Sequence, residues 1–265
     1  MKLILQGLTP RTHANVIGEM FDGRVERAII GVAFASEDGV SLIEPIIKPH
    51  AEKITVFAGI RNEITSAQAL KRLLEIGVSL YAVDTGSRAL LFHPKLYYVR
   101  KAELAHFTVG SANLTLGGLN NNIEAGVLLE LELVDKDDAA FVGDLEKSFD
   151  ELTGEHPENV FAVTDEATID RLLDAGRLID ETAAPPPRPA TRAKAGSTDP
   201  TPRMKMQPKP VRGKPKPKAP PAPAAAPLAA VAAPPAATAP AMPAPGNAPG
   251  ASATVAPDLE LVWES

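Results

Sequence analysis

The chain has 265 residues, with 27 basic and 33 acidic side chains and no cysteine, which excludes disulfide bonds, thiolate metal sites and cysteine catalysis. Its charges are unevenly distributed, because residues 1–182 hold 17 basic and 29 acidic side chains, whereas residues 183–265 hold 10 and 4. Of the 26 prolines, 21 lie from Pro185 onward. The composition therefore predicts one folded, acidic domain over 1–182 and a basic tail of different character.

Residues 1–182 alternate short apolar runs with amphipathic segments. The apolar runs predict strands at 3–5, 27–34, 53–58, 78–83, 95–99, 107–110 and 125–134. The amphipathic segments predict helices at 12–21, 36–47, 65–76, 137–152 and 165–179, the last two forming a helical C-terminal extension over about 137–180. This alternation predicts an α/β layered domain, a mixed β-sheet with helices on both faces.

The stretch from Leu91 to Glu124 holds residue types that suit attack on a phosphodiester. His93 and Lys95 stand two apart, and the run 110–113 (Gly-Ser-Ala-Asn) begins fifteen residues after Lys95. A glycine pair at 117–118 and an asparagine run at 120–122 then lead to Glu124. Imidazole can act as nucleophile or general acid, and lysine, serine and asparagine can stabilise phosphate oxygens. His93 and Lys95 share one face of an extended chain, where a phosphate between them would relieve the repulsion of two cations.

This stretch resembles the HxK…GSxN signature of the phospholipase D-like (HKD) superfamily, especially its small nuclease and restriction-endonuclease branch. The resemblance covers residues 1–150 in layout and implies the layered fold of that superfamily. It also implies that the catalytic residues are His93, Lys95, Asn113 and Glu124, with Glu124 orienting the histidine. Ser111, Thr115 and Arg100 are the expected substrate-binding residues.

One departure from the fullest family pattern, HxKxxxxD, is Arg100 in place of the aspartate. It either marks a nuclease-like branch or indicates a catalytically silent relative. The family mechanism requires two HxK motifs at one site, and this chain has one. The resemblance therefore implies a homodimer with the site at the two-fold interface, a phosphohistidine intermediate, and no metal or other cofactor.

Each of these residues also has a structural interpretation. His93 precedes a proline and can be a packed structural histidine, Ser111 and Asn113 can cap a turn, and Thr115 favours capping. The acidic cluster at 135–138 favours capping of the following helix over metal binding. The remaining histidines, His13, His50, His106 and His156, have no partner pattern and are expected on the surface or in the core.

The tail divides into three segments of low complexity or short length. Residues 183–221 are Pro-rich and basic, 222–257 are Pro/Ala-rich, and 258–265 form a short apolar C-terminal motif in which Leu259, Leu261 and Trp263 alternate. The first two segments cannot bury enough apolar surface to offset chain entropy, so a disordered tail is predicted. The basic segment is either a non-specific nucleic-acid contact or a solvated linker.

Together these features predict a metal-independent phosphodiesterase, above all a nuclease acting on DNA, with RNA as a second substrate class. The alternatives are a catalytically silent DNA-binding or scaffold module and a phospholipid-cleaving phospholipase D-like enzyme. Residues 1–6 are too short for a signal peptide, and the uncharged run 219–257 holds 11 prolines, so neither predicts membrane insertion. The sequence predicts a cytoplasmic protein. Arg61, Arg88 and Lys101, with Arg100, are candidates for positive charge near the site.

Overall fold

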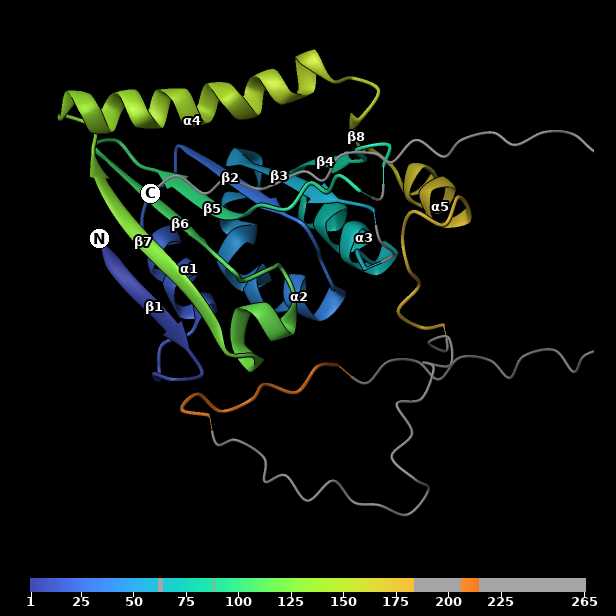
Figure 1. Cartoon of the computed structure of the whole chain (residues 1–265), viewed down its shortest axis with the longest axis horizontal. Coiled ribbons are helices and arrows are strands. Elements are labelled where there is room, and N and C mark those ends of the chain that lie inside the picture. Colours follow the sequence, from blue (N-terminus) through green and yellow to red (C-terminus); the bar gives the residue numbers. More distant parts are fainter. Residues whose placement is uncertain (62–63, 88, 184–205, 215–265) are drawn as a thin grey trace, which may run out of the picture. The chain divides into compact units, whose positions relative to one another are not determined.

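The computed structural model describes residues 1–61, 64–87, 89–183 and 206–214. Its described residues form one sheet of eight strands in the order β1-β7-β6-β5-β2-β3-β4-β8 (Figure 1). The strands are β1 (Lys2–Gln6), β2 (Arg27–Val32), β3 (Ile54–Gly59), β4 (Ser79–Val83), β5 (Lys95–Arg100), β6 (Leu104–Gly110), β7 (Glu124–Glu132) and β8 (Val160–Ala162). The helices are α1 (His13–Phe21), α2 (Glu37–Ile47), α3 (Ala67–Ile76), α4 (Lys136–Glu155) and α5 (Glu166–Asp174), with the short turns η1 (Lys48–Lys53) and η2 (Gly117–Asn121).

The sheet is mixed. Strands β2, β3 and β4 run parallel, and every other neighbouring pair is antiparallel. Val32 at the end of β2 pairs with Lys95 at the start of β5, and Leu96 pairs with Val109 of β6. The C-terminal ends of β2 and β6 therefore lie next to the start of β5. The HxK and GSxN residues lie at this end of the strands.

Helices cover both faces of the sheet, with α1, α2 and α3 on one side and α4 on the other (Figure 1). The core splits accordingly. Ile30, Val56 and Leu70 belong to the larger cluster beneath α1–α3, and Ile29 and Tyr98 belong to a smaller cluster beneath α4. Helices on both faces of a mixed sheet confirm the predicted α/β fold. Because such a sheet is covered on both sides, the buried β2 is apolar on both of its faces.

The predicted elements differ from the structure mainly at their ends. Helix α3 ends at Ile76 as predicted, with Gly77 as its C-cap, but α5 ends at Asp174, five residues before the predicted end at 179. The three-residue strand β8 was not predicted, because so short a run carries no periodicity. On α4, Leu145, Phe149 and Leu152 pack against the smaller cluster, while Phe141 is 43% exposed.

The predicted domain boundaries and tail segments stay predictions, because residues 184–205 and 215–265 lie outside the described residues. Within the tail the structure describes 206–214, which has no helix or strand. Among the described residues, no helix is long and apolar enough to cross a membrane.

Candidate active site

His93 and Lys95 lie side by side where the chain enters β5. Lys95 Nζ is 2.7 Å from Nδ1 and 3.0 Å from Nε2 of His93, whose side chain is exposed. Partial desolvation of the ring and the charge of Lys95 both lower the pKa of His93 below its usual value. The lowered pKa favours the neutral imidazole, whose lone pair is available for nucleophilic attack.

Phe34, which follows β2, connects His93 to Asn113. Its ring meets the imidazole edge-on, with centroids 5.7 Å apart and planes at 75°. Its backbone N–H donates to Asn113 Oδ1 at 3.3 Å, and its carbonyl accepts from Leu114 N at 3.1 Å. Because Oδ1 is held in this way, Nδ2 is the group that Asn113 can offer to a phosphate oxygen.

Ser111 and Glu124 meet across the gap between β6 and β7. Ser111 Oγ donates to Glu124 Oε2, and Asn122 Nδ2 donates to Oε1 at 3.2 Å. The Glu124 carboxylate raises the pKa of Lys95, although desolvation outweighs it and the pKa of Lys95 is lowered overall. Within the described chain no hydrogen bond joins Glu124 to His93, so the orienting contact implied by the resemblance is not made in this structure.

Thr115 shapes the turn that follows Asn113. Its Oγ1 accepts from Gly118 N at 3.0 Å and its carbonyl accepts from Leu119 N at 2.9 Å, which is the capping role weighed above. A Cβ on Gly118 would lie 2.5 Å from the carbonyl oxygen of Asn113, so only glycine permits this close approach. The glycine pair thus holds Asn113 in place, and binding of substrate by Thr115 stays a prediction.

Gln6 is a site-positioning residue that sequence analysis missed. Its fully buried side chain donates from Nε2 to the carbonyls of Gly117, Gly118 and Asn122 at 3.2, 3.0 and 3.1 Å. Its Oε1 accepts from His13 N at 2.9 Å. A glutamine inside the apolar run of β1 was the available signal, because a buried amide needs hydrogen-bond partners.

Arg100 does not join this group. It lies at the far end of β5, where its Nε is 3.1 Å from Glu146 Oε1 of α4, so we leave it out of the proposed site. Arg61 pairs with Asp84 through its Nε. Arg88 lies outside the described residues, so its expected charge near the site stays a prediction.

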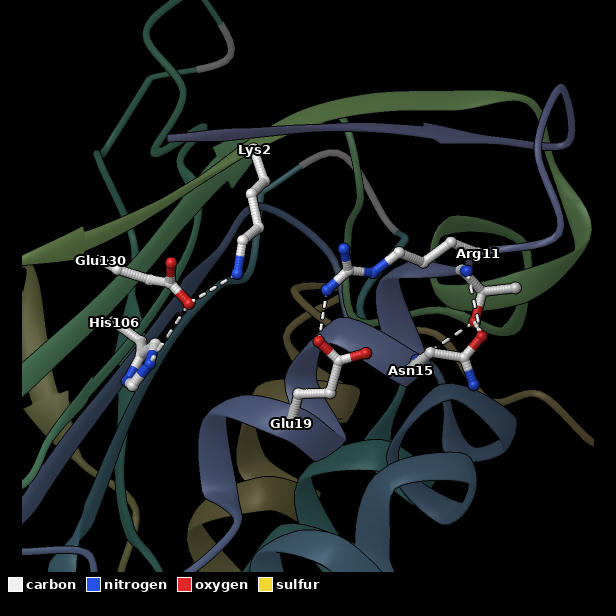
Figure 2. Close-up of polar contacts among 7 residues, drawn as sticks. Lys2, Arg11, Asn15, Glu19, His106 and Glu130 are labelled. Atoms are coloured by element: carbon white, nitrogen blue, oxygen red, sulfur yellow. Dashed lines mark hydrogen bonds and ion pairs between the residues drawn. The ribbon is translucent and has the colours of Figure 1, made fainter.

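The other sequence-level alternatives are resolved by position. Asp135 accepts from the backbone N–H groups of Asp137 and Asp138 and caps α4, which confirms capping for that acidic cluster. His106 lies on β6 near Glu130, which also binds Lys2 Nζ at 2.8 Å (Figure 2). Figure 2 also shows the Arg11–Glu19 pair of the neighbouring α1 region. His13 is 2% exposed. Burial lowers the pKa of both histidines.

One family model matches part of the chain. Residues 43–153, which include His93 through Glu124, match the family model of the cardiolipin synthase, PLD-like domain. This region is therefore similar to a phospholipase D-like domain.

Several solved structures are similar in fold to parts of this chain. NucT from Helicobacter pylori matches with a TM-score of 0.45 and 14% identity, over 61% of this chain and 98% of that one. Nuc from Salmonella typhimurium, a phospholipase D family member, matches with a TM-score of 0.41 and 15% identity, over 62% and 100%. Yeast tyrosyl-DNA phosphodiesterase matches with a TM-score of 0.36 and 16% identity, over 49% and 33%. No curated protein matches the chain.

Proposed function

We propose that this phospholipase D-like domain is a metal-independent phosphodiesterase, a cytoplasmic nuclease that hydrolyses DNA. The observation that carries the proposal is the placement of His93 against Lys95, with Asn113 held beside them through Phe34. A neutral imidazole supplies a nucleophile, and an ammonium and an amide N–H supply donors for the phosphate oxygens.

In the proposed reaction, a ring nitrogen of one His93 attacks phosphorus. A P–N bond forms while the P–O bond to the leaving strand breaks, and the leaving oxygen takes a proton from a second histidine. Water then attacks phosphorus, gives its proton to that second histidine, and releases the first His93 as the P–N bond breaks. Lys95, Ser111 and Asn113 stabilise the charge on the non-bridging oxygens in both steps.

The second histidine comes, in this proposal, from a second copy of the chain. The sequence contains one HxK motif, and its exposed His93 leaves room for the partner's His93 to lie across the same phosphate. The proposed assembly is a homodimer with the site on its two-fold axis. A carboxylate already bonded to Ser111 and Asn122 gives Glu124 a fixed position from which to act on either histidine.

The first experiment is hydrolysis of bis(p-nitrophenyl) phosphate and of plasmid DNA, with and without EDTA. Hydrolysis that persists in EDTA is expected, whereas complete loss that magnesium restores would refute the metal-independent mechanism. His93→Ala should abolish turnover without unfolding the domain, and His156→Ala is the matched control. Phospholipid vesicles as substrate test the lipid alternative, and cleavage of lipid but not DNA would refute the nuclease assignment.

The dimer is tested by mixing. Heterodimers of wild-type and His93→Ala chains should have much less than half of the wild-type activity per site, because each shared site needs both histidines. Light scattering at assay concentration gives the mass of the active species. A fully active monomer would contradict the shared site.

A further inference from the structure

Residues 206–214 of the tail, Met-Gln-Pro-Lys-Pro-Val-Arg-Gly-Lys, form no helix or strand and lie against the domain. Their backbone is held by Asn121, whose Nδ2 donates to the carbonyl of Val211 at 2.8 Å and whose Oδ1 accepts from Val211 N at 2.9 Å. Asn120 Nδ2 donates to the carbonyl of Lys209 at 3.1 Å and to Asn121 Oδ1 at 2.9 Å. The asparagine run noted in the sequence thus binds a peptide backbone on both its donor and acceptor groups.

The two ends of the segment are also held. At one end, Gln207 N donates to the carbonyl of Gly7 at 3.1 Å, and Pro208 is buried. At the other end, Lys214 N donates to Asp38 Oδ1 at 3.0 Å, near the start of α2. A Cβ on Gly213 would lie 2.0 Å from Asp38 Oδ2, so the segment passes close to this carboxylate.

The sequence of the segment suits this mode of binding. Gln207, Lys209 and Val211 use their backbone groups, and the residues between them are prolines, which have no N–H to satisfy. Proline also keeps the chain extended before it binds, which lowers the entropy lost on docking. Recognition through main-chain groups of a pre-extended, proline-rich segment is an established mode of peptide binding.

The docking surface adjoins the candidate active site. Asn120 and Asn121 belong to η2, and the next residue, Asn122, binds the Glu124 carboxylate. Asp38 belongs to α2, whose N-cap residue Ser36 donates its N–H to the carbonyl of Leu114 at 3.0 Å. The segment thus contacts both η2 and α2. The side chains of Lys209, Arg212 and Lys214 are exposed.

We propose that Gly7, Asp38, Asn120 and Asn121 form a docking site for residues 206–214 of the same chain. The docked segment presents Lys209, Arg212 and Lys214 beside the active site as contacts for a phosphate backbone. This second statement rests on the proposed nuclease function, whereas the docking itself does not. The docked segment adds a short row of cations to the acidic domain beside its active site. Substrate affinity should therefore fall as the salt concentration rises, as it does for other contacts with phosphates.

Limited digestion of the full chain with trypsin tests the docking without any assay of activity. Trypsin cuts after lysine and arginine but not before proline, and Lys209 and Lys214 both precede proline. Arg212–Gly213 is therefore the one bond that trypsin can cut within the docked segment, and Lys218–Ala219 serves as an internal comparison. A protease must bind the backbone around Val211, which Asn121 already occupies.

The double variant Asn121→Ala/Asp38→Ala should speed cleavage at Arg212–Gly213 by at least about fivefold relative to Lys218–Ala219. The control variant Asn159→Ala loses a hydrogen bond of 2.7 Å to the Asp84 carbonyl, far along the chain, and should leave the ratio unchanged. Fragments are quantified by mass spectrometry. Equal ratios in the wild type and the double variant would overturn the docking.

The presentation of charge is tested with the triple variant Lys209→Gln/Arg212→Gln/Lys214→Gln. The KM for a DNA oligonucleotide should rise at least about fivefold with a shallower salt dependence, while hydrolysis of bis(p-nitrophenyl) phosphate is unchanged. An unchanged KM would refute the role of these side chains in substrate binding. A lower KM would refute it as well, and would show that the segment hinders access of DNA to the active site. If the wild type hydrolyses neither substrate, the nuclease function fails, and the trypsin result still decides the docking.

Discussion

Gln6 offers a direct test of how the active-site turn is held. We consider Gln6→Met, because methionine has nearly the volume of glutamine and leaves no cavity, while it removes every polar contact of the side chain. Those contacts are three bonds from Nε2 to carbonyls of the 117–122 turn and one from His13 N to Oε1. His13 Nδ1 also lies 3.2 Å from Oε1.

The magnitude follows from the groups left without partners. The carbonyl of Gly117 keeps a backbone bond from Asn122 N at 2.8 Å, so the loss falls on two carbonyls and on His13 N. At about 1 kcal/mol for each buried group, Gln6→Met should lower the free energy of unfolding by about 3 kcal/mol. The turn that carries Asn122 and precedes Glu124 should also shift, and hydrolysis should fall between about tenfold and a hundredfold.

Urea unfolding and hydrolysis of bis(p-nitrophenyl) phosphate measure the two effects. The matched control is Gln68→Met, which removes bonds to Asp180 Oδ1 at 2.5 Å and from Glu181 N at 3.1 Å. It should lower the free energy of unfolding by about 1–2 kcal/mol and leave hydrolysis unchanged. Wild-type stability and activity in Gln6→Met would show that the turn holds itself, and the assignment of Gln6 as a positioning residue would be wrong.

Three further outcomes are expected. Lys95→Met should raise the pKa of His93, measured by NMR titration of its imidazole, because one of the two causes that lower this pKa is removed. Arg100→Met, at the other end of β5, should leave the pKa of His93 unchanged. An equal shift in the two variants would contradict the contact between Lys95 and His93. Because the pKa of His93 is lowered, the nucleophile should stay neutral, and the acid limb of kcat/KM should extend below the ordinary histidine range near pH 6.5, which a full pH profile checks. Glu146→Ala leaves Tyr98, Arg27 and Arg100 without the carboxylate that they share. The free energy of unfolding, measured in urea, should fall by about 1–3 kcal/mol, and hydrolysis should be unchanged. Unchanged stability would show that the packing of α4 does not depend on this cluster.

The fold was predictable because most of its elements carry a strong local signal. The buried β2 is a continuous apolar run, and α3 has a serine N-cap and a glycine at its end. The motif residues were predictable for a similar reason, since HxK and GSxN are short and ordered along the chain. What the sequence could not provide is the partner of each polar group, which depends on the register of strands far apart in sequence.

Arg100 and Phe34 illustrate this limit. Arg100 follows the HxK motif closely, yet Lys95 and Arg100 are five residues apart along β5, and α4 offers Glu146 to the arginine. Phe34 looks like an ordinary core residue at the end of an apolar run. The pairing of β2 with β5 brings its ring to His93, and the bridge between Ala35 and Leu114 brings its N–H to Asn113.

The uneven distribution of charge along the chain bears on how a polyanionic substrate would reach the site. A domain with 29 acidic and 17 basic side chains in its first 182 residues repels a polyanion at long range, and salt screens that repulsion only beyond roughly 10 Å. Two arginines expected to offset it, Arg61 and Arg100, are paired with Asp84 and Glu146. A basic tail bound to Asn120 and Asn121 would place positive charge on the turn that leads to Glu124. Its positive charge would then raise the local concentration of substrate near the histidines. A tail that is joined to the domain only through the covalent chain, without docking, would do so less effectively.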